Sequence, residues 1–196
     1  MDNEFESVFP DNICESMQLQ PIQPGSIKTE VLSALKSSLI FHFAGHGGTN
    51  PKSPLHSQLL LRDYIEDPLT VENLLKTNIG SASPFLAYLS ACGTGENRNA
   101  DLADEGIYLT IACQIAGFRH VIGILWSVDD SMYVKMAEAV YKVLHDEAID
   151  SGRIRDQAVS GALHHAMRKL RDQWVGEANS SKSGEHQRLT RLGRDA

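Results

Sequence analysis

The chain has 196 residues, the size of one domain, and 42% of them are hydrophobic, enough for a buried core. Its net charge is −7 and no Lys/Arg cluster stands out, which argues against nucleic acid as a partner. The amino-terminal residues are acidic and no apolar run reaches ~18 residues, so we expect no signal peptide and no membrane partner. The cysteines Cys14, Cys92 and Cys113 lack the spacing of a zinc site and fit a reducing cytoplasm, where we expect the protein.

The hydrophobic pattern predicts strands that alternate with helices along the chain. Residues 1–26 are acidic and then rich in Gln and Pro, and we expect them to be poorly ordered. The pattern then predicts a helix over 27–37, a strand over 39–44, and a loop over 47–68 with a possible short strand or hairpin at the apolar residues 59–61. It predicts next a helix over 70–78 with Thr70 as N-cap, a strand over 85–90, a helix over 102–116 ended by Gly117, a strand over 120–126, and helices over 130–147 and 156–174. The polar residues 175–196 are expected to be a disordered tail. This alternation predicts an α/β fold with a parallel sheet.

The same pattern predicts which side chains of the later helices share a face. The helix over 102–116 places Ile107, Ile111 and Ile115 on one stripe, and Cys113 is expected in the core. The expected buried residues of the next two helices are Met132, Met136, Ala139, Val140 and Val143, and then Val159, Leu163, Ala166, Leu170 and Trp174.

Two of the predicted strands end in glycine-rich motifs that carry reactive side chains. The strand over 39–44 ends in Gly-His46-Gly-Gly, and the strand over 85–90 ends in Ala-Cys92-Gly-Thr-Gly. Cys92 follows His46 by 46 positions, which is enough for one crossover helix with its loops. Parallel strands that end level would place His46 and Cys92 side by side at the carboxyl edge of the sheet, where open α/β sheets carry their chemistry. A cysteine between Ala and Gly, with a histidine ~50 residues upstream, is also the arrangement found in caspases.

These motifs resemble the CHAT domain, a caspase-like and separase-like branch of the clan CD cysteine peptidases. The resemblance rests on His-Phe-Ala-Gly-His-Gly over 42–47 and Leu-Ser-Ala-Cys-Gly-Thr over 89–94, with further matches over 104–106, 116–126 and 162–174. It covers roughly residues 23–174 and is most similar to the CHAT modules of filamentous fungi. The domain core is accordingly expected over 27–174.

The resemblance implies both a fold and an activity. The expected fold is a caspase-like three-layer α-β-α sandwich with a mainly parallel sheet, truncated at both ends because residues 1–26 and the region after Trp174 lack a convincing apolar strand. The expected activity is that of an endopeptidase with Cys92 as nucleophile, His46 as general acid/base and the backbone N–H groups of Gly47 and Cys92 as the oxyanion hole. The resemblance implies no cofactor and a protein or peptide substrate. It also implies regulatory repeat or sensor domains, in a longer parent protein or in a partner chain.

A pocket for the substrate side chain is expected beside the strand that follows Cys92. An acidic residue there would select Arg or Lys at the cut site, and the candidates are Asp129, Asp130, Asp104 and Glu105, with Trp126 as a possible wall. Asp129 and Asp130 also fit an N-cap and a first-turn acid of the following helix. No metal is expected at His42 and His46, because Gly45 opposes the helix that their spacing would require, and His42 is expected to support the core.

Two other functions are compatible with the residues. An inactive CHAT module could serve regulated protein–protein contact, an alternative that the absent strands favour and the intact Cys-His pair opposes. A phosphate-binding loop at Gly93-Thr94-Gly95 is disfavoured, since the motif lacks the Gly-Lys-Ser/Thr ending of a P-loop.

Overall fold

The computed structural model of this protein describes most of the chain between residues 20 and 192. The described residues are 20, 22–48, 50, 52–77, 79, 83–93, 105–123 and 130–192, and for 91–93, 105–108, 130 and 177–192 the structure describes the backbone alone. The elements are α2 (Lys28–Leu35), β1 (Ile40–Gly48), the short 3-10 helix η1 (Pro54–His56), β2 (Gln58–Leu59), β3 (Leu69–Thr70), α3 (Val71–Lys76), β4 (Leu86–Gly93), α4 (Glu105–Ala116), β5 (His120–Gly123), α5 (Asp130–Ser151) and α6 (Asp156–Leu192).

The described strands form one 5-stranded sheet in the order β3-β2-β1-β4-β5. Strands β1, β4 and β5 run parallel to one another, whereas the short strands β2 and β3 add antiparallel pairs at the edge. The centre of the sheet is therefore parallel, as the alternation of strands and helices predicted.

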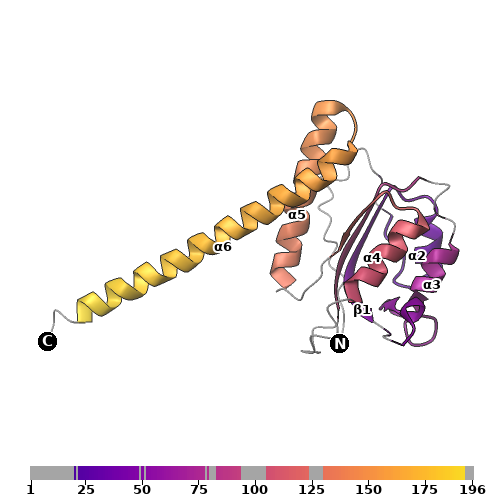
Figure 1. The fold of residues 1–196 in the computed structure, drawn as a ribbon, viewed down its shortest axis with the longest axis horizontal. Helices are drawn as coiled ribbons and strands as arrows, with labels where there is room; N and C mark the ends of the chain where they lie inside the picture. The colour runs from indigo at the N-terminus through magenta and orange to yellow at the C-terminus, as the bar shows by residue number, and fades with distance from the viewer. Residues whose placement is uncertain are drawn as a thin grey trace.

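Helices cover both faces of the sheet, which gives the three-layer α/β fold that was predicted. Helices α2, α3 and α4 lie on one face and α5 and α6 on the other (Figure 1). Alternate residues of β4 divide between the two cores: Ala87 and Leu89 pack with the first group, and Leu86 and Tyr88 with the second. This division follows from the two-residue period of a strand, and it explains why β1 and β4 are apolar on both faces.

Local capping explains where the two short helices of the first layer begin. Thr70 is the N-cap of α3, and a capping box joins it to Asn73, as the sequence predicted for Thr70. The first amide of α2 is capped from a distant loop, because Lys28 N donates to Asp63 Oδ2 at 3.0 Å. Lys28 Nζ also contacts Asp67, so this loop holds the start of α2 at two points.

Strand β1 is longer than the strand predicted over 39–44. It continues to Gly48 because Gly47 and Gly48 pair with Leu59 and Gln58 of β2, a short strand where the sequence indicated a loop with a possible short strand or hairpin. The pairing of β1 with β4 also extends to Gly47 and Gly93, so glycine did not end either strand.

Helix α4 buries a different face from the stripe that was predicted. Its buried residues include Leu109, Ala112 and Cys113, whereas Ile111 is 43% and Ile115 is 68% exposed. Small side chains face the sheet because α4 lies close to β5, where Thr110 approaches Gly123. The predicted helix end is confirmed, since Gly117 has the positive φ of 122° that a helix-ending glycine adopts.

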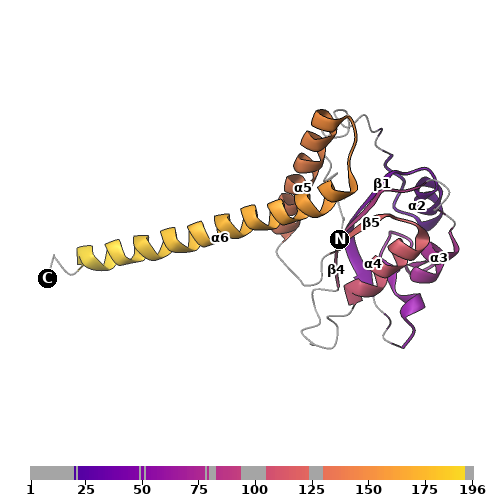
Figure 2. The same ribbon diagram turned by 45° about the horizontal axis from the view of Figure 1, so that its top comes forward.

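Helices α5 and α6 form the second layer, and α6 extends far beyond the rest of the molecule (Figures 1 and 2). Ala139 and Val140 of α5 and Val159, Ala166 and Leu170 of α6 are buried as predicted. The predicted end of α6 at Trp174 is wrong, because the helix continues to Leu192 and Trp174 is 65% exposed. Residues 175–192 contain no proline, the residue that would end the helix most effectively.

Candidate active site at the ends of β1 and β4

The carboxyl ends of β1 and β4 bring the predicted histidine and cysteine positions together. In the register of these adjacent parallel strands, His46 lies opposite Cys92, and Gly47 lies opposite Gly93. The side chain of His46 is exposed, whereas only the backbone is described at Cys92. The predicted juxtaposition of these two positions is therefore present in the sheet, and their catalytic roles stay predictions.

The backbone around His46 is held from both sides. His46 O accepts a hydrogen bond of 2.9 Å from Leu60 N, and Gly47 pairs with Leu59 of β2 as well as with Gly93 of β4. Because the N–H of a strand residue lies in the plane of the sheet, the Gly47 amide is directed at a neighbouring strand. A substrate oxyanion would therefore reach this amide only if the ends of the neighbouring strands separate.

Below this pair of positions, His42 lies between the sheet and α5 in a group of three rings. His42 stacks on Tyr88, its register partner in β4, with ring centroids 5.0 Å apart, and on Tyr141 of α5 at 5.6 Å. Tyr88 and Tyr141 are 5.6 Å apart, so each ring contacts the other two. His42 Nδ1 and Tyr141 Oη lie at a hydrogen-bonding distance of 3.0 Å. We call His42, Tyr88 and Tyr141 the aromatic triangle.

Burial shifts the pKa values of two side chains of the aromatic triangle. Loss of hydration lowers the pKa of His42 from 6.5 to about 4, so its imidazole is neutral at pH 7. The same effect raises the pKa of Tyr88 above its usual value. The sequence predicted a supporting role for His42 but missed both tyrosines. The signal that could have found them is an aromatic side chain with a polar tip, which Tyr88 places in an apolar strand and Tyr141 on the buried side of a helix.

The predicted substrate pocket falls mainly outside the described residues. Trp126, Asp129 and Asp104 all lie outside them. Glu105 and Asp130 are the first residues of α4 and α5, and only their backbone is described. The pocket assignment therefore stays a prediction.

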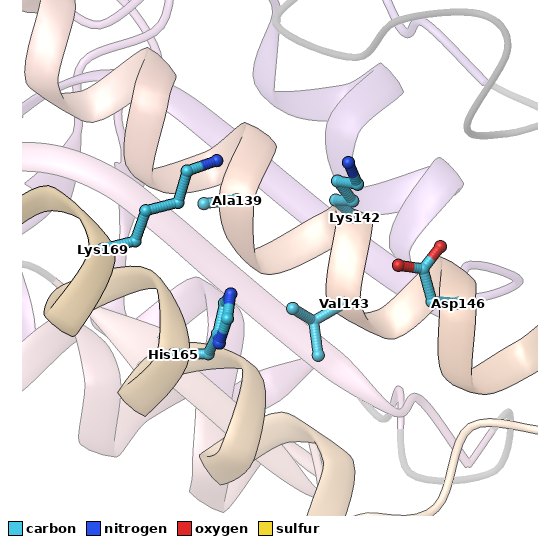
Figure 3. Close-up of a pocket in the computed structure, with 6 residues that line it drawn as sticks. All are labelled: Ala139, Lys142, Val143, Asp146, His165 and Lys169. Atoms are coloured by element: carbon cyan, nitrogen blue, oxygen red, sulfur yellow. The ribbon is translucent and has the colours of Figure 1, made fainter.

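The remaining predicted residues lie away from the ends of β1 and β4. Cys113 is 1% exposed in the core, and burial raises the pKa of its thiol to about 12, which makes it a poor nucleophile at neutral pH. Cys14 lies outside the described residues, and His164 and His165 are exposed on α6. His165 lines a shallow pocket between α5 and α6 with Lys142 and Lys169 (Figure 3), and this pocket contains no residue of β1 or β4.

Two features are absent from the part of the chain that the structure describes. No group of three or more His, Cys, Asp and Glu residues that could hold a metal ion occurs among the residues that the structure describes. In the same part of the chain, no helix is both long enough and apolar enough to cross a membrane.

The fold and the site define a class of protein: a three-layer α/β domain with a histidine and a cysteine at paired positions of its two central parallel strands. Comparison with protein-family models gives a match to the CHAT domain over residues 21–190. The match covers most of the chain, so the chain belongs to the CHAT domain family. It extends beyond the 23–174 of the resemblance into the projecting part of α6. A comparison with curated proteins found no similar sequence.

Proposed function

We propose that this CHAT domain is a caspase-like and separase-like cysteine endopeptidase, in which Cys92 is the nucleophile and His46 is the general acid/base. The observation that supports the proposal most is the pairing of position 46 with position 92 on adjacent parallel strands. The exposure of the His46 side chain also supports it, because a general acid/base must reach substrate and water.

The chemistry that this pair would perform is acyl transfer. The Cys92 thiolate attacks the peptide carbonyl carbon, a C–S bond forms, and the carbonyl oxygen becomes an oxyanion. Protonated His46 gives its proton to the amide nitrogen as the C–N bond breaks, and the amine leaves. Neutral His46 then takes a proton from water, whose oxygen attacks the thioester and releases the acid and the thiolate. The backbone N–H groups of Gly47 and Cys92 would hold the oxyanion in both steps.

The substrate in this proposal is one protein or a few proteins, cut after Arg or Lys. Asp129, Asp130, Asp104 and Glu105 are the acidic candidates that would bind the basic side chain, with Trp126 as a wall of the pocket. We place the protein in the cytoplasm, near the fungal members of the family within clan CD. Regulatory repeat or sensor domains, in a longer parent protein or a partner chain, would control the activity.

The proposal can be tested by labelling with an electrophilic peptidyl-Arg probe that alkylates an active thiol. We expect labelling of the wild-type protein that is lost in Cys92→Ala and weakened in His46→Ala. Cys113→Ala is the matched control, because that thiol is buried and should contribute no labelling. Competition between peptidyl-Arg and peptidyl-Asp probes then tests the basic specificity. Absence of wild-type labelling from mildly acidic to mildly basic pH would refute the peptidase.

One observation favours a second candidate, a non-catalytic CHAT module that serves regulated protein–protein contact. Gly47 is paired on both sides, with Leu59 and with Gly93, so one of the two amides assigned to the oxyanion hole faces a neighbouring strand. In this candidate the strand ends stay closed. The same probe separates the two functions, because a closed module should leave Cys92 unlabelled even in the presence of a large excess of probe.

A further inference from the structure

The aromatic triangle places a half-buried imidazole, whose Nε2 atom is buried, where the neighbouring strand residues are apolar. His42 is the third residue of β1, between Ile40 and Ala44 on the same side of the strand, and faces α5. Two further polar atoms occur on this side: Tyr88 Oη and Ser90 Oγ are buried without a hydrogen-bond partner among the described residues. Groups of this kind reduce stability relative to apolar side chains of the same shape, so stability alone does not account for them.

The hydrophobic pattern of β1 and β4 specifies their register only weakly. Both strands are apolar on both faces, so a slip of two residues leaves every side chain on its own face of the sheet. In the observed register His46 lies opposite Cys92, but a slip of two residues would bring His46 opposite Ser90 or past Gly93. The proposed catalytic pair therefore needs a determinant of register other than apolar packing.

The contacts of His42 supply such a determinant. His42 lies opposite Tyr88 in β4 and reaches Tyr141 in α5, and the two tyrosines contact each other. A slip of two residues moves one strand by about 7 Å relative to the other, which exceeds the reach of a hydrogen bond and of ring contact. All three contacts of the aromatic triangle therefore exist together only in the observed register.

We propose that His42 is a positioning residue, which, with Tyr88 and Tyr141, selects the β1–β4 register in which His46 lies opposite Cys92. The inference rests on the proposed function for its catalytic consequence, whereas the selection of register is a property of the fold. Buried polar groups that fix the alignment of packed elements at a cost in stability are known from other proteins.

The proposal predicts that stability and reactivity change in opposite directions. His42→Phe keeps a ring of similar size but removes the buried imidazole, so its melting temperature should equal or exceed that of the wild-type protein. Its rate of alkylation at Cys92 by the peptidyl-Arg probe should fall by about tenfold to a hundredfold, because only the small fraction of molecules that keeps the observed register holds the pair in alignment. A purely structural role would lower both quantities together. Tyr141→Phe removes only the hydroxyl group and should show the same divergence to a smaller extent.

Phe41→Leu is the matched control on the same strand. Phe41 faces the opposite core and contacts Phe43 and Phe118, with ring centroids 6.5 and 6.2 Å apart, so its truncation should lower the melting temperature. It does not touch the aromatic triangle, so the alkylation rate of its folded fraction should match that of the wild-type protein.

A direct measurement of register separates this proposal from the proposed function. Backbone nuclear Overhauser contacts should show Ala44 beside Ser90 in the wild-type protein, and a second set two residues displaced in His42→Phe. If the wild-type protein is not labelled but His42→Phe shows the second set, the peptidase fails and the register proposal stands. If both His42→Phe and Tyr141→Phe show only the wild-type set of contacts, the register proposal is overturned, whatever the labelling shows.

Discussion

The side of the sheet covered by α2, α3 and α4 differs from the side covered by α5 and α6 in what it buries. The first side is packed by Leu35, Leu74, Leu89 and other apolar residues. The second side also holds apolar residues, but it contains the half-buried imidazole of His42 and the buried hydroxyl groups of Tyr88 and Ser90 as well. Apolar packing stabilises a fold without fixing one alignment, whereas buried polar groups contribute little stability and demand specific partners. The first side should therefore dominate stability, and the second should set the alignment of β1 and β4.

The largest expected effect is the loss of an apolar side chain from the α2–α3–α4 side. Leu74 of α3 is 1% exposed, so Leu74→Ala should lower the free energy of unfolding by about 2–5 kcal/mol through lost burial and a residual cavity. Chemical denaturation measures the change. Lys76→Ala on the same helix is the control, because it removes only an exposed ion pair with Glu72. Similar losses in the two variants would contradict the assignment of stability to this core.

The second prediction concerns the polar side and its response to pH. The pKa of His42 is about 4 in the folded protein and 6.5 when exposed, so the unfolded chain binds more protons between these values. Stability from this group is therefore complete above about pH 6.5 and is lost as the pH falls toward 4, by up to about 3 kcal/mol.

Comparison of two proteins isolates this contribution from the titration of the carboxyl groups. The free energy of unfolding should fall more between pH 7 and pH 4.5 in the wild-type protein than in His42→Phe, which keeps every carboxyl group. His164→Phe, an exposed histidine on α6, should keep the wild-type pH dependence. Equal pH dependence in the wild-type protein and His42→Phe would show that His42 is not buried in its neutral form.

The sequence predicted the parts of this molecule that depend on local pattern. The order of strands and helices and the cap at Thr70 follow from spacing and from residues close in the chain. The meeting of positions 46 and 92 followed from the rule that parallel strands end at one edge.

The features that the sequence missed depend on distant partners. Tyr141 lies 99 positions from His42, so no local pattern joins them. The exposed face of α4 was mistaken for the buried one, because the close approach of α4 to the sheet favours small residues such as Ala112 over Ile111. The extension of β1 depends on its pairing with β2, which the sequence indicated only as a possible short strand or hairpin within a loop.

The third prediction tests how closely the first layer is packed at the sheet. A Cβ atom added at Gly123 of β5 would lie 2.4 Å from Thr110 Cγ2 of α4, so a local shift is unavoidable. Gly123→Ala should lower the free energy of unfolding by about 1–3 kcal/mol. Thr110→Ser removes the methyl group in question and should recover part of the loss in the double variant. A double variant no more stable than Gly123→Ala would place the cause elsewhere.

The smallest expected effect lies on the outside of the second layer and has the opposite sign. Gly161 is an interior residue of α6, and a Cβ atom added there meets nothing within 4 Å. Gly161→Ala should therefore raise the free energy of unfolding by about 0.5–1 kcal/mol, since alanine loses less backbone entropy in a helix than glycine. The pair Gly161→Ala and Gly123→Ala makes the same chemical change on an open helix surface and on a packed strand. Destabilisation by Gly161→Ala would mean that this part of α6 is covered in solution, and the comparison of the two layers would then have to include whatever covers it.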